Sequence, residues 1–583
     1  MDMHAVTKVV SPALVATYES PLDDLNNSTQ AAWEMERTCK QSLTSLRHHN
    51  ASLMVTQLPH ELLSIIFLLV VYEFSITDKL RLTHVCKHWR EAAIGTARLW
   101  RYISDDSFYI AKLFMSRSRG VPLNMLFTTP EYELKPDIDK YIRNADRFRD
   151  IISFAQHQIG SLTIAAHRNY ALGLLKGFSE FPPANLTRLY FIIRDAPLDC
   201  ARALVTHQPL QKVDKPFFAF LESLDRVGCK LQVFVASQIH ALPSFQGLFS
   251  SLEYLQLKRD ETFKMNSPTS MSTLMGVLIQ CTSLVYLDIS EAGPLLPSND
   301  LYPAVTSTVN LPKLRVLCVE YNNPEDIAYL LAILVFPNDT TISINCFGVQ
   351  TKAETFHRIF PRLEHRTQIK KIIDRSSTLI LTIEWSTWSI HCFPPDSHGG
   401  IFIKIPAFDY YGGDNDDVVL NFFLNPLSVI FGSDRVPITT LVINIAGSQR
   451  PPDLFLWTEL FSRFPQLKKL CCNFSLCNDY VKLYMPDSDI ILDALSQPSS
   501  KDRLPCLQLK ELHIGHTKLF QNDFVTSLEA RDAAGASHLE ILEYTDVVFV
   551  GYDDEHGLTL DSLPDLSRFV DKFEVTALVK NSK

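Results

Sequence analysis

The stretch Leu58-Pro59-His60-Glu61-Leu62-Leu63-Ser64-Ile65-Ile66-Phe67 carries the clearest structural signal in the chain. It opens a helix, because a proline in the first turn gives up an N–H that would have no partner there. Glu61 follows in the first turn, where the helix dipole favours an acidic side chain. The apolar residues then form a wide stripe along one side of the helix, made of Leu62, Leu63, Ile66, Phe67 and Val70.

A second helix is predicted just downstream, where Ser75 or Thr77 can provide the cap and Asp78 lies in the first turn. Apolar residues recur at helical spacing on one face of it: Leu82, Val85, Cys86 and Trp89. Trp100 closes the unit. Three or so short helices in about 45 residues carry more apolar surface than such a unit buries alone. An unburied apolar stripe on a small helical module indicates a partner.

The spacing of these residues resembles an F-box: Leu58-Pro59-x-Glu61-Leu62-Leu63-x-x-Ile66-Phe67, then Val85-Cys86-x-x-Trp89-Arg90 and Leu99-Trp100. Together with residues 114–125, the segment is similar to F-box proteins of mushroom-forming fungi. Those usually carry Thr-Pro where this chain has Thr96-Ala97, so a rigid turn is lost. The resemblance implies a Skp1-like adaptor, and through it a cullin–RING ubiquitin ligase, as partner. The residues it assigns to Skp1 binding are Leu58, Pro59, Leu62, Ile66, Phe67, Val85 and Trp89.

Two alternatives stay open for the same residues. The Leu-Pro-x-Glu-Leu-Leu start is also that of an ordinary well-capped amphipathic helix. The helical module would then be a docking domain within a stand-alone protein-binding scaffold that has no ligase attached. The two interpretations differ in whether the stripe on residues 58–70 is covered by the chain's own residues.

After residue 150 the chain repeats a short pattern, Leu-x-x-Leu-x-apolar. Its intervals are often near 30 residues (252 to 284, 284 to 314, 509 to 539), slightly longer than the 20–29 residues of leucine-rich repeats. It begins at Leu186, Leu252, Leu284, Leu314 and Leu509, and in shorter form at Leu467 and Leu539, with a weaker alternation over 438–445. Between these strands, residues 269–279, 324–335 and 453–464 have helical periodicity. Segments with the two-residue alternation of strands therefore alternate with segments that have the periodicity of helices. This pattern predicts strand–helix units that stack on one another to bury their apolar faces.

The predicted fold class is therefore α/β, with a three-helix F-box module followed by an irregular leucine-rich-repeat solenoid. The expected divisions are a disordered tail over 1–25, a helix over 26–52, the F-box over 53–103 and a linker with a first cap over 104–160. The solenoid follows over 161–563, with a turn-rich, acidic insertion near 390–437, and a cap or tail over 564–583.

Such a solenoid usually binds its partner on the concave strand face. The outward positions between the buried leucines mix aromatic, charged and amide side chains, which suits a protein surface. The candidate substrate-binding residues are Tyr254, Gln256, Lys258, Tyr286, Asp288, Glu320, Glu511 and His513. The pattern names no particular substrate, and exposed spacer residues would give the same alternation.

Composition excludes several other functions. With 55 Lys and Arg against 65 Asp and Glu, a net charge of −10 gives no global attraction to nucleic acid. The longest apolar run, residues 62–72, is about half of the ~20 residues that a membrane span needs. Twelve scattered cysteines and no visible secretory signal favour reduced thiols and a cytoplasmic or nuclear location. Since no phosphate loop, zinc helix or nucleophile elbow occurs, we expect no catalytic activity, no metal and no cofactor.

Overall fold

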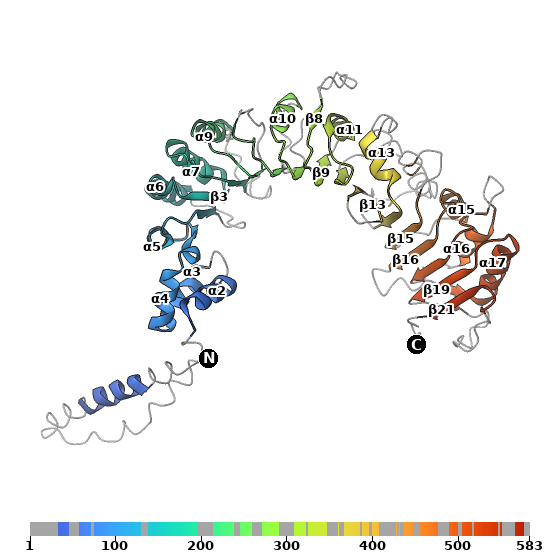
Figure 1. The fold of residues 1–583 in the computed structure, drawn as a ribbon, viewed down its shortest axis with the longest axis horizontal. Helices are drawn as coiled ribbons and strands as arrows, with labels where there is room; N and C mark the ends of the chain where they lie inside the picture. The colour runs from blue at the N-terminus through green and yellow to red at the C-terminus, as the bar shows by residue number, and fades with distance from the viewer. Residues whose placement is uncertain are drawn as a thin grey trace. The chain divides into compact units, whose positions relative to one another are not determined.

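A computed structural model gives the fold, and Figure 1 shows its elements. It describes residues 33–45, 58–71, 75–129, 138–194, 214–237, 247–258, 271–290, 308–321, 324–346, 367–384, 387–395, 399–406, 437–446, 454–475, 489–498, 504–515, 518–545, 548–550 and 566–575, with a few isolated positions between them. The chain divides into two compact units, one holding residues 1–103 and 113–121 and the other 104–112 and 122–583. The expected tail over 1–25 lies outside the described residues. Within the expected helix over 26–52, residues 33–45 are helical and exposed.

The first unit contains a helical module, residues 58–103. Its helices are α2 (His60–Val70), α3 (Ile76–Val85) and α4 (Lys87–Gly95), followed by the 3₁₀ turn η4 (Ala97–Trp100). Pro59 is the N-cap residue of α2. Ser75 caps α3, where its hydroxyl accepts a hydrogen bond from the backbone N–H of Asp78 at 3.2 Å. The predicted cap of the second helix is confirmed at Ser75, whereas α2 begins one residue after Pro59 and not with Pro59 in its first turn.

The second helix is shorter than its apolar spacing predicts, because the backbone is extended at Cys86 (φ −157°, ψ 174°). There one helix ends and another begins, and the Cys86 Sγ accepts a hydrogen bond from the Trp89 N–H at 3.4 Å. Our placement of Leu82, Val85, Cys86 and Trp89 on one face of a continuous helix was therefore wrong. The break turns α4 so that Trp89 packs against Phe67 of α2, with ring centroids 5.1 Å apart.

The core of the helical module is small and aromatic. Leu63 and Phe67 are its buried residues from α2, and Ala92 and Ala93 those from α4. Trp100 is fully buried, and its indole N–H donates to the Ala93 carbonyl at 2.8 Å. Leu-Trp at 99–100 therefore closes the module as the sequence predicts.

The second unit is built on a long, mostly parallel sheet. Hydrogen-bonded neighbours follow the order β2-β3-β4-β5-β6-β7-β9-β11-β14-β13-β12-β15-β16-β17-β19-β21. The strands in the N-terminal part are β2 (Leu123–Thr128), β3 (Ile159–Ala166), β4 (Arg188–Ile193), β5 (Val233–Ser237), β6 (Tyr254–Lys258), β7 (Tyr286–Ser290), β9 (Val316–Tyr321) and β11 (Thr341–Cys346). The rest are β12 (Thr378–Ile383), β13 (Thr387–Phe393), β14 (Gly400–Pro406), β15 (Thr440–Ala446), β16 (Lys469–Ser475), β17 (Glu511–Gly515), β19 (Leu539–Thr545) and β21 (Val570–Val575).

Helices lie along one face of this sheet (Figure 1). They are α6 (Ile138–Ala155), α7 (Arg168–Glu180), α9 (Asp214–Arg226), α10 (Met271–Leu278), α11 (Pro324–Ile333), α13 (Thr367–Asp374), α15 (Leu454–Ser462), α16 (Asp489–Ser496) and α17 (Gln521–Ala533). Two short parallel pairs, β8 (Val309–Asn310) with β10 (Leu334–Val335) and β18 (Lys518–Phe520) with β20 (Val548–Val550), complete the second unit. Two elements reach the unit boundary, β1 (Tyr102–Ser104) and α5 (Phe108–Ser118).

Alternate strand residues form continuous buried rows under the helices. One such row runs across consecutive strands in register and is fully buried: Leu189, Phe234, Leu255, Leu287 and Leu317. The residues between them point to the opposite side of the sheet, which we call the strand face. The predicted strands at the Leu-x-x-Leu motifs and the predicted helices near 271, 324 and 454 are thus present.

The regular order changes in the middle of the sheet. β14 pairs parallel with β11, and β12 pairs parallel with β15, while β13 between them is antiparallel to both neighbours. The structure therefore differs from the insertion expected near 390–437, because β13 and β14 belong to the sheet. Their alternating apolar residues, such as Ile401, Ile403 and Ile405, are buried like those of the other strands.

Both ends of the sheet lie in segments expected to hold caps. Strand β2 and helix α6 lie within residues 104–160, the expected linker and first cap. Near the C-terminus, β21 pairs with β19 inside the segment expected to be a cap or tail.

Candidate protein-interaction sites

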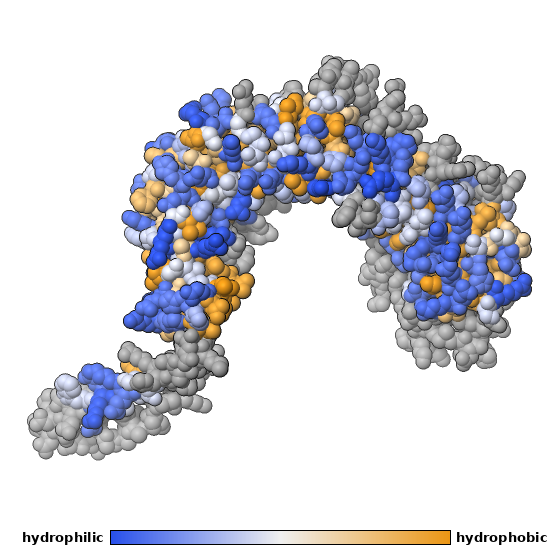
Figure 2. Space-filling model, in the orientation of Figure 1, coloured by the Kyte–Doolittle hydropathy of each residue, from blue (hydrophilic) through white to orange (hydrophobic). Residues whose placement is uncertain are grey.

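Helix α2 carries a hydrophobic surface that the described part of the chain leaves exposed. Leu69 is 80% exposed and Val70 is 72% exposed, and Ile65, Leu62, Leu68 and Ile66 are also exposed. Figure 2 shows hydrophobic side chains gathered over this helix. We call these six residues the α2 face. A group of large apolar side chains this exposed is typical of a surface that binds another protein.

The structure separates the residues assigned to adaptor binding into two groups. Pro59, Leu62, Ile66 and Val85 are exposed, and Leu58 is half-buried. Phe67 is only 1% exposed. Its assignment to the contact surface needs a correction, because its ring fills the interior of the module against the half-buried Trp89.

Sequence reasoning missed Ile65, Leu68 and Leu69 because it used helical spacing to select one stripe. Residues 62–71 are apolar almost all around the helix, while the module buries only Leu63, Phe67 and Val71 from this stretch. A short helix that is hydrophobic on all sides but belongs to a small module must expose part of that surface. That excess of apolar residues is the signal that identifies the rest of the α2 face.

The start of α2 is tied to α4 by two histidines. His88 bonds through Nε2 to the Leu58 carbonyl at 2.8 Å, and its Nδ1 lies 3.1 Å from Nε2 of His60. The carbonyl can only accept, so His88 donates to it through Nε2. These bonds fix the Leu58-Pro59 segment relative to the rest of the module.

On the strand face, five of the predicted substrate-binding residues lie together on β6 and β7. Tyr254 and Tyr286 occupy the same register position, and their rings stack with centroids 4.3 Å apart and planes 2° apart. Gln256 Nε2 donates to Asp288 at 2.5 Å, and Lys258 lies 3.9 Å from the same carboxylate. Burial raises the pKa of both tyrosines, so both hydroxyls keep their protons at neutral pH.

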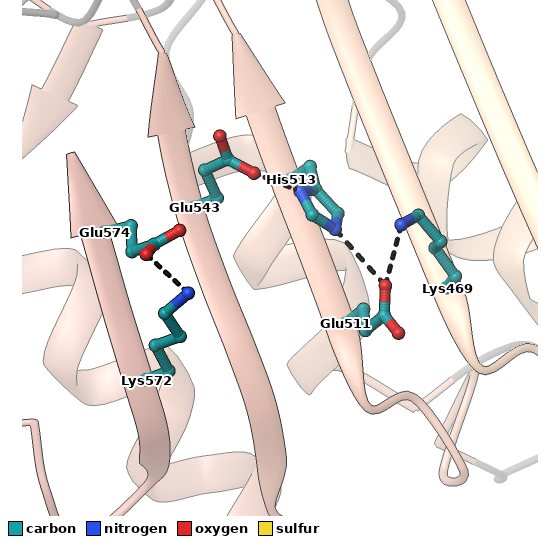
Figure 3. Close-up of polar contacts among 6 residues, drawn as sticks. All are labelled: Lys469, Glu511, His513, Glu543, Lys572 and Glu574. Atoms are coloured by element: carbon teal, nitrogen blue, oxygen red, sulfur yellow. Dashed lines mark hydrogen bonds and ion pairs between the residues drawn. The ribbon is translucent and has the colours of Figure 1, made fainter. Parts of the chain in front are cut away.

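A second polar cluster lies on β16, β17, β19 and β21 (Figure 3). Lys469 Nζ lies 2.7 Å from Glu511, and His513 lies between two carboxylates, with Nδ1 2.6 Å from Glu543 and Nε2 3.5 Å from Glu511. At the end of the row Lys572 pairs with Glu574 at 2.6 Å. We call these six residues the C-terminal ladder.

Charge pairing shifts the pKa values of two residues in this ladder. The hydrogen bond from Lys469 lowers the pKa of Glu511, and the same bond raises the pKa of Lys469. Both groups are therefore held in their charged forms. His513 pairs with Glu543 across two strands, and Lys572 pairs with Glu574 along β21. The ladder is therefore a pre-arranged surface of paired charges.

The predicted substrate-binding residues do not form one site. Those of β6 and β7 are separated from Glu511 and His513 by the strands from β9 to β16. Glu320 of β9 is next to Ser290 of β7 in register, at the edge of the first cluster. Residues that the sequence did not single out extend the second cluster: Glu543, Lys572 and Glu574.

Among the described residues, no three His, Cys, Asp or Glu side chains come close enough to hold a metal ion. No helix in the described segments is long and apolar enough to cross a bilayer. Both clusters pair their charges internally, which suits the recognition of a protein surface.

Comparison with known protein families finds a match for the helical module near the N-terminus. A family model described as F-box-like matches residues 55–106, so this part of the chain is an F-box-like domain. The match covers α2, α3, α4 and η4, including the α2 face.

No curated protein matches the chain. Among solved structures, a chain from the crystal structure of the yeast Rad7 and Elc1 complex matches with 13% identity over 93% of this chain and 98% of that one. The TM-score of that match is 0.18, which supports no conclusion on fold or function.

Proposed function

We propose that this chain is a non-catalytic substrate-recognition subunit of an SCF-type cullin–RING ubiquitin ligase. In this proposal the F-box-like domain binds a Skp1-like adaptor through the α2 face. The stacked strand–helix units are a divergent leucine-rich-repeat solenoid that holds a protein substrate on its strand face. Tethering would convert substrate ubiquitination from a bimolecular encounter into a local one by raising the effective concentration.

The main observation in support of the proposal is the exposed α2 face within residues 55–106. The sequence left open whether the chain's own residues cover this stripe. Leu69 and Val70 are more than two-thirds exposed in the chain as a whole, so the described residues leave the stripe uncovered. This favours an external partner over an ordinary docking domain of a scaffold.

The test is co-expression with Skp1 followed by gel filtration of the full chain. The informative variant is Leu62→Glu with Ile66→Glu, because both side chains are exposed and neither fills the core. Removal of a buried interface anchor typically costs about 2 kcal/mol or more, so two charges should abolish co-elution. The matched control is Ile279→Glu, an isoleucine of the second unit that is 53% exposed, against 37% for Ile66.

Co-elution of wild type and Ile279→Glu, with loss in the double variant, would support the adaptor role. Circular dichroism of the double variant must match wild type, so that loss of binding is separated from loss of fold. If folded wild-type protein does not bind Skp1, the proposal fails and the stand-alone scaffold becomes the better description. A ligase subunit of this kind would act in the cytoplasm or the nucleus, which fluorescence imaging of the tagged chain would test.

A further inference from the structure

Two tyrosine rings stack on the strand face where β6 and β7 begin. The ring centroids of Tyr254 and Tyr286 lie 4.3 Å apart, and the planes differ by only 2°. Both side chains are half-buried, and they are direct neighbours in the parallel register. Each ring therefore covers the inner side of the other and turns its outer side toward the next residue in the same row.

That next residue is a valine on both sides of the pair. Val233 of β5 is in register with Tyr254, and Val316 of β9 is in register with Tyr286. Both valines are half-buried, so the chain does not seal them from solvent. Neighbouring strands are about 4.7–4.9 Å apart, close to the spacing of the two rings. Because a valine ends nearer the sheet than a tyrosine ring does, the row has room for one more flat ring above each valine.

The charges beside the tyrosine pair are balanced within the cluster. Asp288 is 5% exposed, and both of its carboxylate oxygens accept hydrogen bonds, from Ser290 Oγ at 2.8 Å and from Gln256 Nε2 at 2.5 Å. Lys258 lies 3.9 Å from the same carboxylate. The tyrosine hydroxyls are neutral, because burial raises the pKa of both. This electrical balance favours an uncharged side chain as the ligand over a cation.

We propose that the Tyr254–Tyr286 pair anchors an aromatic side chain of a protein partner, whose ring continues the stack above Val233 or Val316. Stacked aromatic rings attract one another beyond the gain from buried apolar area. Tyrosine also has few rotatable bonds, so a packed pair loses little freedom on binding. Under the proposed function this partner is the substrate, and in that respect the inference rests on the proposed function.

A nucleic-acid base is the other ligand that stacks on tyrosine. The chain carries a net charge of −10, which gives no global attraction to a phosphate backbone. The geometry and the charge together therefore favour a protein side chain, and oligonucleotide binding becomes one outcome of the test.

The test titrates the full chain with short blocked peptides of glycine and serine that carry phenylalanine, leucine or arginine at the centre. Ligand-observed NMR gives the apparent dissociation constants. We expect the phenylalanine peptide to bind about 2- to 12-fold more tightly than the leucine peptide, because only the ring can stack. The arginine peptide should bind no better than the leucine peptide.

Three double variants test the anchor. Tyr254→Leu with Tyr286→Leu keeps apolar surface but removes the rings, so the preference for phenylalanine should disappear. Tyr254→Phe with Tyr286→Phe keeps the rings and should bind like wild type. Val233→Tyr with Val316→Tyr fills both positions with the chain's own rings and should block the peptide, while tyrosine remains a good strand residue. The matched control is Tyr329→Leu, a half-buried tyrosine on α11.

Equal binding of the phenylalanine and leucine peptides to wild type would overturn the site, as would full peptide binding by the variant with both valines replaced. Tighter binding of a single-stranded oligothymidine than of the phenylalanine peptide would reassign the surface to nucleic acid and overturn the protein partner. Circular dichroism checks the fold of each variant. If the double leucine variant does not fold, the valine variant decides the matter.

Co-elution with Skp1, measured on the same preparations, separates this inference from the proposed function. Skp1 binding without a preference for the aromatic peptide would remove the anchor site alone. An aromatic preference without Skp1 binding would remove the proposed function and leave the anchor site standing.

Discussion

The rings of Phe67 and Trp89 pack with centroids 5.1 Å apart and planes tilted by 57°. Phe67 is 1% exposed, while Leu69, two residues further along α2, is 80% exposed. The same helix therefore uses one group of apolar residues to hold its own module together and leaves another group exposed. Variants on the two sides should separate stability from binding.

Phe67→Ala should destabilise the helical module by about 3–5 kcal/mol, because it leaves a cavity next to Trp89. Leu69→Ala should change stability by no more than about 0.5 kcal/mol, since its side chain is exposed. Hydrogen exchange of peptides from residues 58–100 in the full chain measures both. Similar losses of protection in the two variants would contradict the assignment of inner and outer faces.

Cys86→Ala should weaken the start of α4, because the Sγ of Cys86 accepts from the Trp89 N–H. Loss of a side-chain cap costs about 0.5–2 kcal/mol, and serine is among the best capping residues. We therefore expect Cys86→Ser to retain the stability of wild type and Cys86→Ala to lose about 1 kcal/mol. Thermal unfolding measured under identical reducing conditions compares the two, and equal losses would show that the cap is unimportant.

The Lys469–Glu511 pair should contribute a coupling of less than about 1 kcal/mol, because both side chains are about one-third exposed to screening solvent. The folded pKa of Glu511 is lowered, so its contribution is present above the unfolded pKa and is lost as pH falls through the folded value. The folded pKa of Lys469 is raised, so its contribution is present below its unfolded value and is lost as pH rises through the folded one.

A double-mutant cycle of Lys469→Met and Glu511→Gln at neutral pH, in low and high salt, measures that coupling. We expect it to decrease in high salt. A coupling that is independent of salt would mean that the contact is not ionic.

Asp105→Asn should alter the pH dependence of stability. Burial raises the pKa of Asp105 to about 6, although the Tyr170 hydroxyl donates to it at 2.7 Å. The folded state then holds a proton that the unfolded state has lost, so stability falls as pH rises from about 4 to about 6. The amide removes this slope and should stabilise the chain at pH 7 by up to about 3 kcal/mol.

Urea unfolding of wild type and Asp105→Asn between pH 4 and pH 7 tests this, since the amide can still accept from Tyr170. Parallel curves for the two proteins over this range would contradict the raised pKa.

Much of the fold was predictable, because strands and helices bury alternate residues with different periods. Leu255, Leu287 and Leu317 are fully buried and adjacent in register, as the Leu-x-x-Leu motif predicts. The helix break at Cys86 was not predictable. The helical spacing of apolar residues continues past Cys86, although the helical backbone ends there. Nor was the reversed order of β12, β13 and β14 predictable, since it depends on the pairing of β14 with β11 and of β12 with β15, which are distant in sequence.

The candidate sites were predictable only in part. Outward positions follow from strand alternation, which located Tyr254, Tyr286 and His513. Alternation along one strand does not say which residues face one another across strands. The pairing of His513 with Glu543, and the separation of the two polar clusters, depend on strand order and register, which the sequence pattern does not specify.

The inverted order of β12, β13 and β14 has a consequence for how the chain folds and for which deletions it tolerates. In most of the sheet a strand pairs with the next one along the chain, so each new unit can add to a surface already formed. β12, β13 and β14 instead pair with one another as an antiparallel run, which joins the rest of the sheet through β14 with β11 and β12 with β15. Each of these two pairings closes a longer loop than the pairing of consecutive strands, which predicts the slowest step of the second unit. Deletion of one unit should be tolerated on either side of this region but not within it.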